Sequence, residues 1–76
     1  MRRVRVVVTL RPGMLDAAGQ AVAQGLRALG YDVGEVRVGK VVDLEVPDGT
    51  DVEELCRTVL ANPLVETWEV LPGVVA

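Results

Sequence analysis

The stretch Glu35-Val-Arg-Val-Gly-Lys-Val-Val-Asp-Leu-Glu-Val46 decides the fold, because apolar and charged residues alternate along most of it. Alternation with a period of two is typical of a β-strand with one buried face. Gly39-Lys40 interrupts the pattern and places glycine at the first central position of a tight turn. We therefore expect two strands joined as a hairpin; the alternative is one long strand bent at Gly39.

Upstream of this stretch, residues 3–10 predict another strand, with Val4, Val6 and Val8 on one face. Arg11-Pro12-Gly13 then breaks the pattern. A helix is expected after Asp16, whose carboxylate can accept from free N–H groups of the first turn. Its apolar stripe is narrow and built largely of small residues, and Gly30 is suited to end it in the left-handed conformation.

Downstream, Pro47-Asp48-Gly49 predicts a turn, and Thr50-x-x-Glu53 matches a capping box that starts a second helix. Its apolar stripe is Val52, Leu55, Cys56, Val59 and Leu60. Asn62-Pro63 ends this helix, and residues 64–71 alternate as a last strand. We expect the tail after Pro72 to fray.

These elements predict an α+β fold with the order β-α-β-β-α-β in a single domain, residues 1–76. The expected architecture is a four-stranded, mainly antiparallel sheet with two helices on one face. The opposite face would be bare and is a natural surface for self-association. Half of the residues are apolar and the mean hydropathy is +0.34, which also favours an interface in a chain this small.

Composition excludes several classes of function. The chain has no histidine, no serine and a single cysteine, so Ser-His and Cys-His nucleophilic pairs and the usual zinc ligand sets are absent. A net charge of −3 with only Tyr31 and Trp68 as aromatics argues against a nucleic-acid binder. No export signal or membrane-length apolar run is evident, which favours the cytoplasm. We predict no catalytic, cofactor-binding or metal-binding residue in this chain.

Two readings of the glycines near residue 39 compete. Gly34 to Lys40 has the Gly-x-x-x-x-Gly-Lys spacing of a phosphate loop, but Val41 replaces the magnesium-binding hydroxyl and no helix is expected after Lys40. A free-standing ATP-dependent enzyme is therefore disfavoured. Arg37, Gly39 and Lys40 are instead the candidate partner interface, where the two charges would meet an acidic surface; a solvated hairpin is the plainer alternative.

Four segments, taken together, resemble one family. Leu15-Asp-Ala-Ala-Gly-Gln-Ala-Val22 resembles its Leu-Asp-Pro-x-Gly-x-Ala-Val segment, and Leu29-Gly-Tyr31 resembles the end of its first helix. Val36-Arg-Val-Gly-Lys40 resembles its Val-Arg-x-Gly-Lys turn, and Leu60-Ala-Asn-Pro63 with Glu66 resembles its Leu-Ala-Asn-Pro-x-x-Glu ending. The family is PurS, the small subunit of phosphoribosylformylglycinamidine (FGAM) synthase. Ala17 stands where proline is usual, and Trp68 where tyrosine is common.

The resemblance implies a non-catalytic assembly subunit in purine biosynthesis. Such a subunit forms a homodimer or higher oligomer, bridges a glutaminase and a large synthetase subunit, and assists ammonia transfer between them. ATP and magnesium would bind the large partner subunit, with no cofactor in this chain. The alternative is a homodimeric amino-acid-binding regulatory domain of the same β-α-β-β-α-β type, on which Arg11-Pro12-Gly13 would be the ligand turn.

Overall fold

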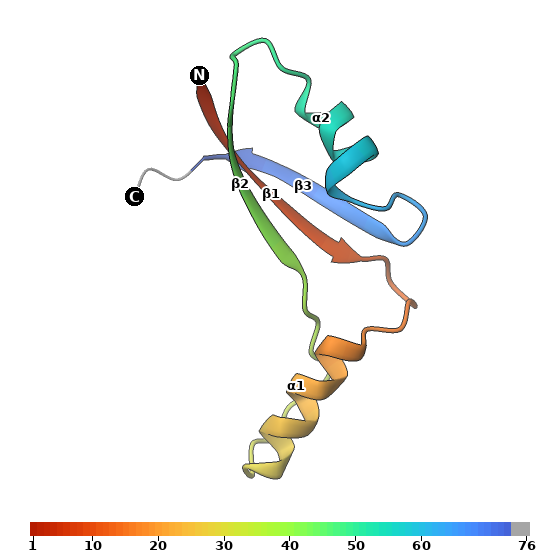
Figure 1. Ribbon diagram of the computed structural model, residues 1–76. Coiled ribbons are helices and arrows are strands. Elements are labelled where there is room, and N and C mark those ends of the chain that lie inside the picture. Colours follow the sequence, from red (N-terminus) through yellow and green to blue (C-terminus); the bar gives the residue numbers. More distant parts are fainter. Residues whose placement is uncertain (74–76) are drawn as a thin grey trace.

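The structure is a computed structural model that describes residues 1–73 (Figure 1). Along the chain the elements are β1 (Arg2–Leu10), α1 (Ala17–Ala28), β2 (Lys40–Val46), α2 (Val52–Leu55), the π-helical turn η1 (Cys56–Leu60) and β3 (Glu66–Pro72). The fold is α+β, as predicted. None of the helices in the described residues is long and apolar enough to cross a membrane.

The sheet has three antiparallel strands in the order β2-β1-β3, so the prediction of four strands is wrong for the single chain. The central strand β1 pairs Val6 with Val42 on one side and with Val70 on the other. Directly paired residues of antiparallel strands point to the same face. The valines of β1 therefore define a core face that continues onto both neighbouring strands.

The expected hairpin at Gly39-Lys40 does not form, and residues 31–39 belong to no strand. A two-residue hairpin turn needs a glycine with positive φ, but among the described residues only Gly13 and Gly30 have one. Side-chain register gives the reason. Such a turn would pair Val38 with Val41, and hence Arg37 with Val42, bringing a charged side chain onto the core face.

One helical segment covers the core face, so the prediction of two helices on one face of the sheet is wrong for the single chain. The buried core consists of β-strand valines and residues of α2 and η1: Val4, Val6, Val8, Val46, Val52, Cys56 and Ala61. Helix α1 instead projects away from the sheet and makes no substantial contact with any strand (Figure 1). The radius of gyration is 15.4 Å, against about 11 Å expected for a compact domain of this length.

Residues 33–39 run back beside α1. The Arg27 guanidinium donates to the Gly34 carbonyl at 3.1 Å, and the Val38 N–H donates to Asp16 Oδ2 at 2.9 Å. The helix rises about 16 Å between residues 16 and 27. The four steps from residue 34 to 38 can span at most about 14 Å, and the Arg27 and Asp16 side chains cover the rest, so this segment is stretched out rather than coiled. We call residues 14–39, the helix with its extended return segment, the arm.

The helix ends follow local rules, with one correction. Asp16 Oδ1 accepts from the Gly19 N–H at 2.8 Å, and Gly30 has φ +91°, as predicted. The Thr50 capping box is wrong: the N-cap of α2 is Asp51, whose Oδ1 accepts from the Glu54 N–H at 3.2 Å.

The predicted apolar stripe of the second helix is displaced by its last turn. The Ala61 N–H donates to the Cys56 carbonyl at 2.9 Å, five residues back, so η1 is a π-turn. As a result Ala61 is buried, whereas Val59, which was placed on the stripe, is 73% exposed. The Gly73 N–H still pairs with the Arg3 carbonyl at 3.0 Å, so the tail does not fray there, and residues 74–76 lie outside the described residues.

Candidate subunit interface

The predicted interface residues lie where the arm meets the sheet. Asp16 is the central group of this junction, because its two oxygens accept from the Gly19 and Val38 N–H groups. These two backbone hydrogen bonds hold the pKa of Asp16 below its ordinary value, with a smaller contribution from the nearby charge of Arg37. One ionised carboxylate therefore ties the start of α1 to the return segment.

Gly39 lies against the end of β1. A Cβ atom at this position would stand 2.4 Å from the Val8 carbonyl oxygen and 2.8 Å from Thr9 Cγ2. Such an approach leaves no room for a side chain, so glycine is required here for close packing of the backbone rather than for a turn. The chain thus leaves the sheet at a fixed point.

The other two predicted interface residues, Arg37 and Lys40, differ in whether they make contacts within the chain. The Arg37 guanidinium donates to the Leu10 carbonyl and lies 3.8 Å from Glu35 Oε1. Lys40 opens β2 opposite Val8 and is exposed. An open hollow of about 290 Å³ is lined by Val8, Thr9, Leu10, Asp16, Ala17, Ala18, Val38, Gly39, Lys40 and Glu66. The structure brings Arg37, Gly39 and Lys40 together, but Arg37 is engaged within the chain.

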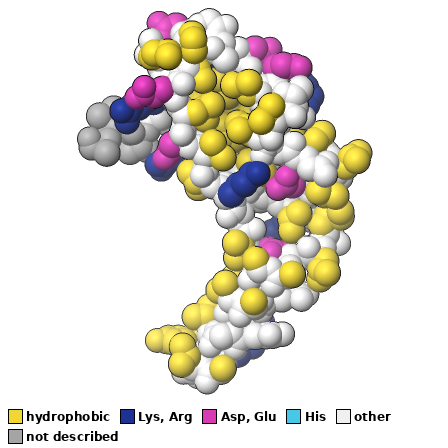
Figure 2. Space-filling view, in the orientation of Figure 1, with side chains coloured by type: hydrophobic (Ala, Val, Ile, Leu, Met, Phe, Trp, Pro, Cys, Tyr) yellow, Lys and Arg dark blue, Asp and Glu magenta, His cyan; other side chains and the backbone are white. Residues whose placement is uncertain are grey.

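Exposed apolar residues are concentrated on the arm (Figure 2). Leu15, Leu29 and Tyr31 are 74%, 77% and 62% exposed. The remaining large apolar residues exposed on or next to the arm are Met14, Val22, Val38 and Val41. Sequence reasoning missed this surface because it placed α1 against the sheet. The narrow apolar stripe of α1 could have indicated that this helix does not pack on the sheet, since a helix with few large apolar residues gains little from sheet packing.

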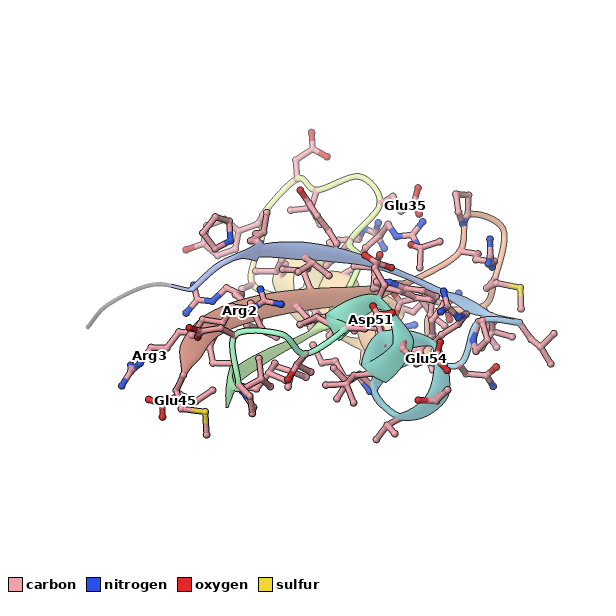
Figure 3. All side chains as sticks on the ribbon, turned by 90° about the horizontal axis from the view of Figure 1, so that it is seen from above. Arg2, Arg3, Glu35, Glu45, Asp51 and Glu54 are labelled. Atoms are coloured by element: carbon pink, nitrogen blue, oxygen red, sulfur yellow. The ribbon has the colours of Figure 1, made fainter. Side chains whose placement is uncertain are left out.

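The sheet face opposite the core, predicted to be bare, carries ion pairs at its β1–β2 side. Arg5 Nε lies 2.7 Å from Asp43 Oδ1, and Arg3 Nη2 lies 2.9 Å from Glu45 Oε1. Figure 3 shows Arg3 and Glu45 together at the edge of the sheet. The hydrogen bond from Arg5 lowers the pKa of Asp43. Both pairs are solvent-exposed and contribute little to stability, but they make this side of the face polar.

The chemistry available in the described residues is limited. No group of three or more His, Cys, Asp or Glu residues within 1–73 could hold a metal ion. Cys56 is fully buried, and burial raises the pKa of its thiol. Glu53 accepts from Trp68 Nε1 at 2.9 Å, which pins α2 to β3. Lys40 begins the strand β2 rather than a helix, so the Gly34–Lys40 segment lacks the helix N-terminus that a phosphate loop requires.

Comparison with known proteins gives a consistent match. Residues 3–72 match the profile of PurS, described as phosphoribosylformylglycinamidine (FGAM) synthase. The FGAM synthase subunit PurS of Synechocystis is 45% identical over 71 residues, covering 84% of this chain and 71% of the relative. That of Mycobacterium leprae is 40% identical over 74 residues, covering 92% and 94%.

Two solved structures share the fold. Bacillus subtilis PurS superposes with a TM-score of 0.82 at 34% identity, covering 92% of this chain and 95% of that one. A chain of the Thermotoga maritima PurLQS structure gives a TM-score of 0.77 at 30% identity, covering 95% and 99%.

Fold and surface together define a class: a small α+β chain whose exposed arm suits it to assembly. The matches then specify it. The chain belongs to the PurS family, and it is a PurS subunit of FGAM synthase, an enzyme of purine biosynthesis. The resemblance drawn from the four sequence segments is confirmed.

Proposed function

We propose that this chain is the non-catalytic assembly subunit that bridges the glutaminase and the ATP-dependent synthetase subunits of FGAM synthase. The observation that carries the proposal is the likeness to a chain of the PurLQS structure across almost the whole sequence. The reaction it supports converts formylglycinamide ribonucleotide, glutamine and ATP to FGAM and glutamate. ATP and magnesium bind the large subunit, and the complex works in the cytoplasm.

A bridging subunit matters because ammonia is small, diffusible and largely protonated in neutral water. Only the free base attacks the activated amide carbon. A closed and aligned path from the glutaminase to the synthetase keeps ammonia unprotonated and raises its local concentration. The chain supports this role by shape: an extended molecule, 48 Å in its longest dimension, can contact two partners at once.

Arg37, Gly39 and Lys40 are the proposed contact with a partner subunit. The geometry distinguishes them: Arg37 donates to the Leu10 carbonyl, and Gly39 packs on Val8, whereas Lys40 is exposed. Lys40 is therefore the residue that can be changed without disturbing the junction. Lys40→Glu should weaken binding to an acidic partner surface by about tenfold or more, and Lys40→Gln by less. If calorimetry gives both variants the same affinity for the partners as the wild type, Lys40 makes no contact with a partner subunit.

The bridging role is tested by reconstituting the large subunit and the glutaminase with and without this chain. Each mixture is fed either glutamine or free ammonium, and FGAM is measured. We expect glutamine-dependent synthesis only when the chain is present, and ammonium-dependent synthesis in both cases. If the chain changes neither rate, the bridging proposal fails.

A further inference from the structure

The C-terminal end of β1 leads directly into a tight turn. The Met14 N–H donates to the Arg11 carbonyl at 3.2 Å, and Gly13 has φ +85°. Pro12 precedes this glycine, and a proline followed by a glycine with positive φ is typical of a type II turn. Because the proline ring fixes one backbone angle and the hydrogen bond closes the turn, this backbone has little conformational freedom.

A second turn, residues 62–65, connects η1 to β3. The Asn62 carbonyl accepts from the Val65 N–H at 3.1 Å and from the Glu66 N–H at 2.8 Å. The side-chain oxygen of Asn62 also accepts from the Leu64 N–H at 3.1 Å. In return, Glu66 Oε1 accepts from the Asn62 N–H at 2.8 Å. Asparagine at the start of a turn thus closes it with both its backbone and its side chain.

Arg11 joins the two turns, which we together call the double turn (residues 11–14 and 62–65). Its backbone N–H donates to the Val65 carbonyl at 2.8 Å. Its guanidinium donates to the Pro63 carbonyl through Nε at 3.2 Å and through Nη2 at 2.7 Å. A guanidinium has five N–H donors, and the other three have no acceptor within residues 1–73. They are therefore free to bind an acceptor on another molecule.

The double turn is rigid and yet exposes apolar side chains. Leu64 is 83% exposed and Met14 is 41% exposed, and the proline of each turn is exposed as well. Figure 2 shows hydrophobic side chains gathered along this edge of the molecule. A surface that is already ordered loses little conformational entropy when a partner binds it. Exposed apolar side chains on such a surface are suited to contact with another protein.

We infer that the double turn anchors a partner subunit of FGAM synthase, in which an apolar pocket receives Leu64 and a carboxylate beside that pocket accepts from Arg11. This inference rests on the bridging function proposed above. Lys40 lies at the same end of β1, because it pairs with Val8 on the β2 side, whereas the double turn adjoins β3. One acidic partner surface can therefore meet both basic residues.

The charge of the double turn argues against a second copy of this chain as the occupant. A two-fold contact sets the same patch of each copy against itself. Arg11 is the charged residue of the double turn, and neither stretch contains Asp or Glu. Such a contact would therefore bring two guanidinium groups together with no anion to pair with them, which is unfavourable. A different subunit can supply the carboxylate.

Substitution of Leu64 tests the anchor in a mixture of the large subunit and the glutaminase. The chain is titrated into this mixture, and the concentration that gives half-maximal glutamine-dependent FGAM synthesis is measured. Leu64→Asp should raise this concentration at least about tenfold, because the burial of a leucine is lost and a charge enters an apolar pocket. Leu64→Ala should give a smaller increase, and ammonium-dependent synthesis should not change.

Val59→Asp is the matched control for Leu64→Asp. Val59 is 73% exposed on η1 and lies outside the double turn, so its substitution should leave the half-saturating concentration at the wild-type value. Circular dichroism melts establish that both variants are folded. An unchanged half-saturating concentration for Leu64→Asp, or an equal increase for Val59→Asp, would overturn the inference.

Arg11→Gln tests the carboxylate of the partner. Glutamine keeps an N–H donor for the Pro63 carbonyl but carries no charge. The half-saturating concentration of the wild type should rise as potassium chloride is added, because salt screens ion pairs. That of Arg11→Gln should be higher at low salt and should rise less steeply. An equal dependence on salt in the two chains would contradict the ion pair.

The same experiments distinguish failure of the anchor from failure of the bridging function. If glutamine-dependent synthesis does not require the wild-type chain, the bridging proposal itself fails. If synthesis requires the chain but Leu64→Asp acts like the wild type, only the anchor fails. Light scattering should give Leu64→Asp the mass of the wild type. A lower mass with unaltered synthesis would show that a second copy covers the double turn, and this too would overturn the inference.

Discussion

The sheet with α2 and η1 and the arm differ in where their stabilising contacts come from. In the sheet, Val6 is fully buried between two strands and belongs to the same core cluster as Cys56. In the arm, Gly19 and Ala23 are the buried helical residues, and both are too small to bury much apolar area. The sheet can therefore stabilise itself, whereas α1, an isolated helix of 12 residues, is of marginal length in water. The difference teaches that burial within one chain accounts for only part of this fold.

The largest expected effect comes from comparing a charged substitution in the sheet with one in the arm. Val6→Asp puts an unpaired carboxylate at the centre of the core and should cost more than about 4 kcal/mol, enough to unfold a domain of this size. Val22→Asp on the arm should leave cooperative unfolding of the sheet intact and lower the mass of any self-assembled form. Circular dichroism melts and light scattering measure the two outcomes; equal losses of stability would mean that the arm and sheet fold as one unit.

A smaller effect is expected at the glycine between the two regions. Gly39→Ala adds a Cβ at 2.4 Å from the Val8 carbonyl oxygen, and relieving such a contact should cost roughly 1–3 kcal/mol. Gly25→Ala is the control, because nothing lies within 4 Å of that position and alanine in a helix stabilises by about 0.5–1 kcal/mol. Urea unfolding gives both values, and a neutral Gly39 variant would show that the arm can shift at the junction.

The smallest effect concerns pH. The pKa of Asp16 is lowered in the folded chain, so its contribution to stability is present above the ordinary aspartate pKa of about 4 and is lost as pH falls through the lower folded value. Asp16→Asn keeps one oxygen as an N-cap acceptor and cannot titrate, but its NH2 group cannot replace the second oxygen that accepts from Val38. Hydrogen exchange of α1 amides between pH 7 and 2 should show an acid-dependent loss of protection in the wild type only.

Local signals in the sequence predicted most elements correctly. Asp16 and Gly30 bound the first helix, and alternation located three of the four expected strands, because these features depend on near neighbours. The placement of α1 failed for a different reason. Alternation suggests an extended backbone at residues 36–38 but does not show whether they pair with another strand, and a glycine at residue 39 serves a close backbone approach as readily as a turn.

The candidate site was only partly predictable. The two charges flanking Gly39 singled out Arg37, Gly39 and Lys40 as a candidate interface, and the structure places all three beside the end of β1. The role of Asp16 as the carboxylate that joins helix and return segment was not foreseen, because its second hydrogen bond spans 22 residues to Val38. Thr50 and Asp51 both precede the same apolar run, and the capping-box pattern favoured Thr50 as the cap. Only the backbone geometry identifies Asp51 as the N-cap.

The π-turn at Cys56–Leu60 also bears on how sequences of this family can vary in length. It holds one residue more than an α-helical turn would need between Cys56 and Ala61, while both ends of the turn stay buried. The surplus residue bulges toward solvent, where Thr58 and Val59 are exposed. Deletion of a single residue here would return the turn to α-helical geometry, so it can be absorbed at this point without moving β3.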